Sequence, residues 1–157
     1  MQQQLVFGII NALHDLFTAF WIGGLLTSGF AFMPAIKGAS DKPGSMKKLL
    51  QLYQDKLRVV AVVSIVGLWI TGMLMGKQSP AYAGFLNFST TYNMLLSLKH
   101  LIIFVMIAIA VYRGFILGRK IESFNPKQQK LYAALLLINL VLGIVVVFLS
   151  GIGSVLG

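Results

Sequence analysis

The stretch LYAALLLINLVLGIVVVFLS, residues 131–150, runs for twenty residues without one Asp, Glu, Lys or Arg. A helix of twenty residues is about 30 Å long, which is the thickness of the hydrocarbon core of a bilayer. Three further predominantly apolar runs occupy residues 5–33, 57–76 and 93–112. The sequence therefore predicts an all-α, polytopic membrane protein, with residues 1–157 forming one four-helix transmembrane bundle.

The composition excludes several classes of protein. Charged residues make up 11% of the chain and hydrophobic residues 57%, whereas a soluble domain averages about 25% charged residues. The absence of cysteine excludes disulfides, thiolate zinc sites and cysteine-ligated iron–sulfur clusters. The sequence also lacks a phosphate-binding glycine loop, a nucleophile elbow and paired carboxylates. Four spans leave no room for a separate soluble catalytic domain.

Basic residues are concentrated in two of the segments that join the spans. Eleven of the thirteen Lys and Arg residues lie within 37–58 and 113–130. The positive-inside rule then predicts that both segments are cytoplasmic loops and that both termini lie outside, in what we expect to be a prokaryotic cell membrane. The net charge of +9 is accounted for by this topology. The lipid bilayer is thus the expected partner, and no nucleic-acid partner is predicted.

Four ionisable residues fall inside the apolar runs, as the adjacent pairs His14–Asp15 and Lys99–His100. Placing an ionisable side chain in the centre of a membrane costs about 2.5–3.5 kcal/mol, so each of these residues is expected to have a structural or functional role there. Counted from the outer ends of their spans, His14 lies at a depth of about 13.5 Å and His100 at about 10.5 Å. Two histidines at one depth on two helices of a bundle are typical of the axial ligands of a haem. Another metal, a proton-transfer role and plain interhelical hydrogen bonding are the alternatives.

Several neighbours fit a haem b held between His14 and His100, at one haem per chain. Trp21 and Trp69 are expected to wall the planar cofactor. Lys99 has three alternative roles: partner of the haem propionates, partner of Asp15 in a buried ion pair, or rival of His100 as second ligand. With both axial positions filled by protein, the iron has no open site, which favours electron transfer.

Copper is the alternative metal. Met73 and Met75 form a Met-x-Met pair near the outer end of the second span, and thioethers are soft ligands that suit Cu(I). Alternate residues of a helix point about 200° apart, so the two sulfurs chelate one ion only if the helix unwinds.

The segment HDLFTAFWIGGL, residues 14–25, resembles the first helix of the CopD family of copper-resistance membrane domains, with a histidine seven residues before Trp-x-Gly-Gly. Arg58 opens the second span and Thr71-Gly72 closes it, as in that family. Leu98-Lys99-His100-Leu101 resembles the Leu-Lys signature of the family's third helix. The resemblance implies a role in copper uptake.

The CopD family is related to HemJ-type protoporphyrinogen oxidases, which are small four-helix proteins that bind haem b. That resemblance implies a haem-ligand role for His14 and an essential role for Lys99. The chain differs from HemJ where HemJ carries Tyr-Leu-Pro-Arg, because residues 27–30 here read TSGF.

Taken together, these patterns predict a membrane-embedded bis-histidine haem b protein that transfers electrons. The alternatives are a CopD-like copper transporter, a HemJ-like oxidase, and a subunit or assembly factor that packs against larger partners or against copies of itself. The sequence identifies no redox partner and does not show whether a quinone takes part.

Overall fold

The computed structural model describes the backbone of residues 1–38 and 43–156, without the side chains of residues 36–38, 43–46 and 122. Part of the first basic segment, including Lys37 and Lys42, therefore lies outside the described side chains. Within these limits the chain is helical and contains no strand.

Four long helical stretches make up the molecule. In chain order the elements are α1 (Gln2–Leu26) with the π-helical turn η1 (Thr27–Phe32) and α2 (Met33–Gly38); α3 (Pro43–Gln78); α4 (Thr91–Val111) with the π-helical turn η2 (Tyr112–Leu117) and the 3₁₀ helix η3 (Gly118–Ser123); and α5 (Pro126–Leu156). Each stretch contains a helix long and apolar enough to cross a membrane. The predicted fold class is confirmed, and the protein is a multi-pass integral membrane protein.

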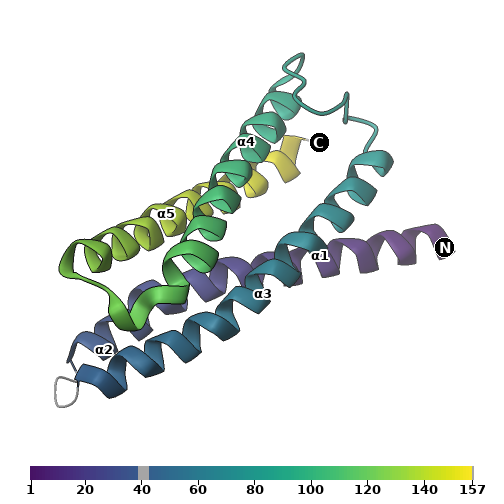
Figure 1. Cartoon of the computed structure of the whole chain (residues 1–157). Helices are drawn as coiled ribbons and strands as arrows, with labels where there is room; N and C mark the ends of the chain where they lie inside the picture. Colours follow the sequence, from purple (N-terminus) through teal and green to yellow (C-terminus); the bar gives the residue numbers. More distant parts are fainter. Residues whose placement is uncertain (39–42, 157) are drawn as a thin grey trace.

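The helices alternate in direction along the chain (Figure 1). Both termini and the connection between α3 and α4 lie toward one end of the molecule, while α2 and the green turn before α5 lie at the other. α1 packs mainly against α3, and α4 packs mainly against α5. Many large apolar side chains remain exposed, among them Phe30 and Phe148, each at 69%. An apolar exterior of this kind is what a bilayer requires.

The interior holds one main apolar cluster along the bundle. It consists of Trp21, Ile22, Leu25, Met106, Leu136, Leu140 and Val146. These residues come from α1, α4 and α5, and partly buried side chains of α3 such as Ala61 and Leu68 pack against them.

The two basic segments differ from the expectation that they are loops. Residues 47–58 form the first turns of α3, and Arg113 lies in η2 with only 8% of its surface exposed. A backbone near the hydrocarbon region must satisfy its own hydrogen bonds, so helices continue through the membrane interface. The loop prediction is therefore wrong over most of both segments. Their predicted cytoplasmic location stays a prediction.

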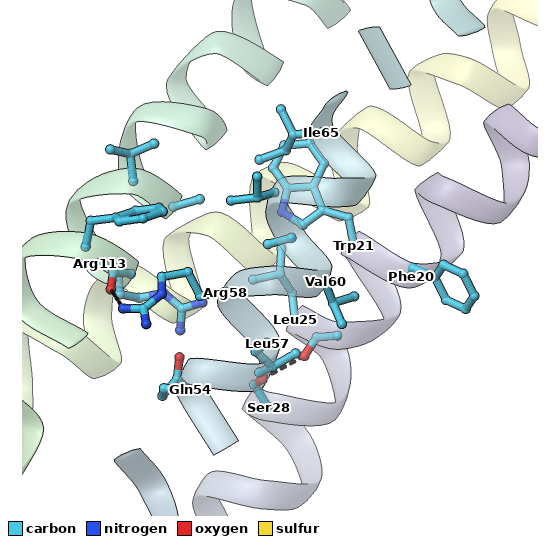
Figure 2. Close-up of a pocket in the computed structure, with 17 residues that line it drawn as sticks. Phe20, Trp21, Leu25, Ser28, Gln54, Leu57, Arg58, Val60, Ile65 and Arg113 are labelled. Atoms are coloured by element: carbon cyan, nitrogen blue, oxygen red, sulfur yellow. Dashed lines mark hydrogen bonds between the residues drawn. The ribbon is translucent and has the colours of Figure 1, made fainter. Parts of the chain in front are cut away.

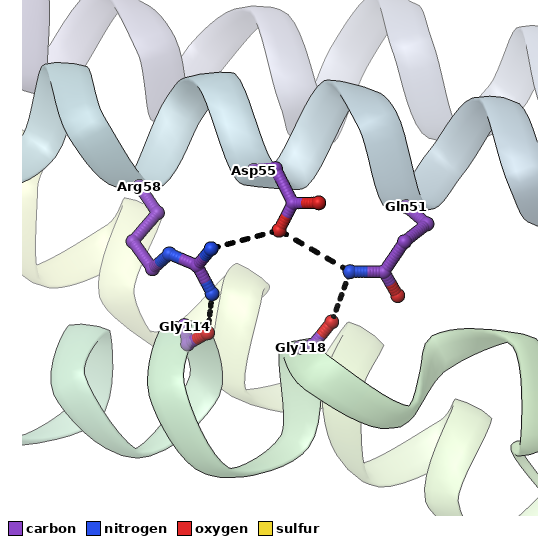
Figure 3. A network of polar contacts seen from close by, with 5 residues as sticks. All are labelled: Gln51, Asp55, Arg58, Gly114 and Gly118. Carbon is purple, nitrogen blue, oxygen red and sulfur yellow. Dashed lines mark hydrogen bonds and ion pairs between the residues drawn. The ribbon is translucent and has the colours of Figure 1, made fainter.

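A polar network joins α3 to η2 and η3 at the basic end of the bundle (Figure 3). Arg58 Nη2 lies 2.9 Å from Asp55 Oδ1, and Arg58 Nη1 donates to the Gly114 carbonyl at 3.2 Å. Gln51 Nε2 donates to the Gly118 carbonyl at 2.8 Å and to Asp55 Oδ1 at 3.3 Å. Carbonyl groups lose intrahelical partners where a helix ends or changes type, and here side chains of α3 replace those partners.

The orientation of the bundle can be tested by thiol labelling, since the chain has no native cysteine. Ser89 and Ser123 are both exposed, one on the connection before α4 and the other at the opposite end of the bundle. We expect Ser89→Cys to react with an impermeant reagent in intact cells and Ser123→Cys to react only after permeabilisation. The reverse pattern would place the termini inside.

Candidate functional site

The ionisable residues of the first and third spans lie in one region. His14 lies in the first half of α1, and Lys99 and His100 lie in the first half of α4. Helix α3 completes the region with Thr71, which contacts His14 directly. Three of the five predicted site residues therefore lie toward the same end of the bundle, although 86 positions separate His14 from His100 in the sequence.

The hydrogen bonds of His14 determine which ring nitrogen carries its proton. His14 Nδ1 lies 2.9 Å from Thr71 Oγ1, and Thr71 Oγ1 donates to the Gly67 carbonyl at 2.7 Å. A hydroxyl has a single hydrogen, so Thr71 must accept from His14. The proton of neutral His14 is therefore on Nδ1, and Nε2 carries a free lone pair.

His100 reaches the same state through a different partner. His100 Nδ1 lies 2.6 Å from the backbone carbonyl oxygen of Leu96, one turn earlier on α4. A carbonyl only accepts, so Nδ1 must be the donor and Nε2 again carries the lone pair. The edge of the His100 ring packs against Phe85, with ring centroids 5.5 Å apart.

Both histidines thus have the hydrogen-bonding pattern of metal ligands. A ligating histidine almost always donates its second ring N–H to a carbonyl or another acceptor, which fixes the ring orientation. Within the described part of the chain, neither His14 nor His100 uses Nε2 in a hydrogen bond. No cluster of three or more His, Asp or Glu side chains forms among the described residues. The arrangement offers two neutral nitrogen ligands.

The surface of α3 that faces α1 is flattened by two glycines. A Cβ added to Gly67 would overlap the ring of Phe17, whereas one added to Gly72 would lie 3.6 Å from His14 Cε1. Small residues at a helix interface allow close approach. Here they allow two α1 rings, including that of His14, to lie directly on α3.

The polar residues that share a face of α4 with His100 are buried, but they bind the preceding connection. Asn93, 1% exposed, accepts from the backbone N–H of Ala83 at 3.1 Å and donates to the Ala81 carbonyl at 3.1 Å. Ser97 donates to the Asn87 carbonyl at 2.8 Å. These bonds hold the connection that carries Phe85 against α4.

The remaining predicted residues lie elsewhere or lack the expected partner. Trp69 is 39% exposed and packs against Phe104, with ring centroids 5.6 Å apart. Trp21 is buried at 4% exposure and lines a cavity in which neither histidine takes part. In the part of the chain that the structure describes, Asp15 and Lys99 form no ion pair. Met73 is 57% exposed on the outer surface of α3.

Two residues of the site had no predicted role. Thr71 stands out in sequence as a hydroxyl within an apolar span, but nothing in its own helix shows that it binds His14. Phe85 belongs to an irregular connection whose path depends on Asn93 and Ser97. Both contacts are made between segments far apart in the chain, so local patterns cannot predict them.

Comparison with known proteins shows which family the chain belongs to. The family model for CopD, copper resistance protein D, matches residues 54–152, which include Thr71, Lys99 and His100 but not His14. No curated protein and no solved structure matches the chain. The family match covers more than half of the chain and includes the segments Thr71-Gly72 and Leu98–Leu101. This chain belongs to the CopD family.

Proposed function

We propose that this protein carries copper across the membrane as its transported substrate, and that Nε2 of His14 and of His100 bind the ion on its way. The observation that carries the proposal is that both imidazole rings have the same hydrogen-bonding pattern: in each, Nδ1 is hydrogen-bonded and Nε2 is free. Membership of the CopD family supports copper as the metal.

The donor set suits a transport site. Imidazole nitrogen is a good ligand for copper, and Cu²⁺ is the most strongly bound of the common divalent first-row metals at a given site. Conduction needs binding that is strong enough for entry and weak enough for exit. Two nitrogen ligands meet that requirement better than a closed cage of three or four ligands.

A third group points to a cation path on α1. Asn11 lies three residues before His14, so the two share a helix face. Asn11 Oδ1 is buried and has no hydrogen-bond partner among the described residues. An unpartnered amide oxygen one turn outward from His14 is a suitable contact for an entering ion or for its water.

Lys99 is expected to weaken copper binding. Lys99 directly precedes His100 in α4, and a cation beside a ligand disfavours binding of a second positive ion. We therefore expect Lys99→Met to tighten copper binding by the order of tenfold. The measurement is competition with a chromophoric copper chelator in detergent, with Lys77→Met as the matched control at the exposed end of α3. Loss of binding in Lys99→Met would instead identify Lys99 as a ligand.

The proposal is tested directly in liposomes. Purified protein reconstituted into vesicles that contain a copper-sensitive dye should give dye quenching when copper is added outside, and empty vesicles should not. Elemental analysis and an absorption spectrum on the same sample measure bound copper and haem. No uptake above the level of empty vesicles would reject the transport proposal.

The haem b interpretation receives no support from the described side chains. A macrocycle between His14 and His100 needs flat walls, but Trp21 lines a different cavity and Phe85 packs against the ring of His100. The electron-transfer role and the HemJ-like oxidase role rest on that cofactor. A low-spin b-type spectrum at about one haem per chain would restore them.

A further inference from the structure

A second polar site lies nearer the basic end of the bundle, away from the histidines. A cavity of about 50 Å³ opens between α1, α3 and the junction of α4 with η2. Figure 2 shows Trp21 from α1, Gln54 and Arg58 from α3, and Arg113 from η2 grouped around it. A space of this size admits at least one water-sized group.

Three residues that line this cavity carry hydrogen-bond donors without an acceptor. Trp21 Nε1, Gln54 Nε2, and Nε and Nη1 of Arg113 are buried without a partner in the described structure. The three side chains are only 4%, 7% and 8% exposed. Buried polar groups are nearly always hydrogen-bonded, so four unpaired donors around one space indicate a missing acceptor.

The positive charge of Arg113 indicates which kind of acceptor is missing. No carboxylate in the described part of the chain pairs with Arg113, and its guanidinium carbon lies 5.2 Å from the centroid of the Tyr132 ring. Arg58 already binds Asp55 and the Gly114 carbonyl. A water molecule accepts hydrogen bonds but does not neutralise a buried cation, whereas an anion does both.

We propose that this cavity binds a phosphate group, with Arg113 as its counter-ion and Gln54 and Trp21 as neutral donors. The planar guanidinium fork matches the oxygens of a phosphate. The rim favours a phospholipid as the source, because Phe20, Val60 and Val111 line the cavity and are 51%, 41% and 47% exposed on the lipid-facing surface. The phosphate would occupy the polar floor, and the acyl chains would lie on this apolar rim.

The test is native mass spectrometry of the detergent-purified full chain titrated with phosphatidylglycerol, and separately with inorganic phosphate. We expect one phosphatidylglycerol adduct per chain at saturation. Arg113→Gln should weaken it about tenfold or more, because a hydrogen bond to a charged group contributes at least a factor of ten. Arg119→Gln removes an exposed arginine of the same segment and should leave the affinity unchanged.

Two conservative variants keep the test valid if Arg113→Gln fails to fold. Gln54→Met removes one unpaired donor with little change in volume, whereas Trp21→Phe removes the indole N–H together with part of the ring. Each should weaken the lipid adduct severalfold. Saturable binding of inorganic phosphate with the same mutational pattern would support the phosphate site and assign it a soluble ligand. Absence of both adducts, or equal affinity in wild type, Gln54→Met and Trp21→Phe, would overturn the proposal. Neither outcome depends on copper transport.

Discussion

His14→Ala and His100→Ala are each expected to lower copper affinity by more than about 100-fold and to abolish uptake in liposomes. Each substitution removes one of two nitrogen ligands, and loss of even an outer hydrogen-bond partner of a ligand costs about 10- to 100-fold. The measurement is competition with a chromophoric chelator, followed by the vesicle assay. Wild-type affinity in either variant would refute the ligand assignment.

Matched variants separate ligand loss from general damage. Leu13 and Leu101 each stand next to one of the two histidines in the sequence, and their side chains are 41% and 45% exposed. Leu13→Ala and Leu101→Ala should therefore leave copper binding unchanged. Thr71→Val keeps the shape of the side chain but removes the acceptor for His14 Nδ1. We expect it to weaken copper binding about 10- to 100-fold, an effect smaller than that of His14→Ala.

Gly67→Ala is expected to lower the free energy of unfolding by about 1–3 kcal/mol, the usual cost of overpacking a well-packed interface. Its new Cβ would overlap the Phe17 ring, so α1 must move away from α3 or Phe17 must leave its position. Either change disturbs the contact between His14 and Thr71, one turn of helix further on. Thermal unfolding in detergent and copper uptake should therefore both decline.

Gly72→Ala is the matched control, at the other glycine of α3 that lies against a ring of α1. Its Cβ would lie 3.6 Å from His14 Cε1, an ordinary contact, so stability should change little. Phe17→Leu combined with Gly67→Ala should recover part of the lost stability, because the shorter side chain makes room for the methyl group. Equal stability of Gly67→Ala and wild type would show that α1 and α3 are not packed closely at this point.

Several features of the candidate site follow from the sequence alone. His14 and His100 are the two histidines of the chain, and counting residues from the span ends places them at one depth. That calculation assumes a constant helix rise and span ends that are fixed by the bilayer, and the common depth stays a prediction. The sequence does not show which nitrogen of each ring is hydrogen-bonded. That depends on Thr71 of another helix for His14, and on the backbone carbonyl of Leu96 for His100.

The burial of Arg113 could not be predicted from the composition of its segment. Its position in a basic segment predicted an exposed loop, yet it is 8% exposed and lines a cavity with Trp21 and Gln54. Trp21 was expected beside the histidines, but the packing of α1 against α3 places it in that cavity. The number of basic residues in a segment does not show which of their side chains is buried.

The sequence by itself determined that four apolar helices cross a membrane, because the length and hydrophobicity of a span are local properties set by the solvent around it. It also carried the CopD motifs. Only the tertiary structure decided which polar groups meet, namely His14 with Thr71 and the unpaired donors around Arg113. Those pairings depend on the rotation and separation of helices, which are set by side-chain packing such as that of Phe17 on Gly67.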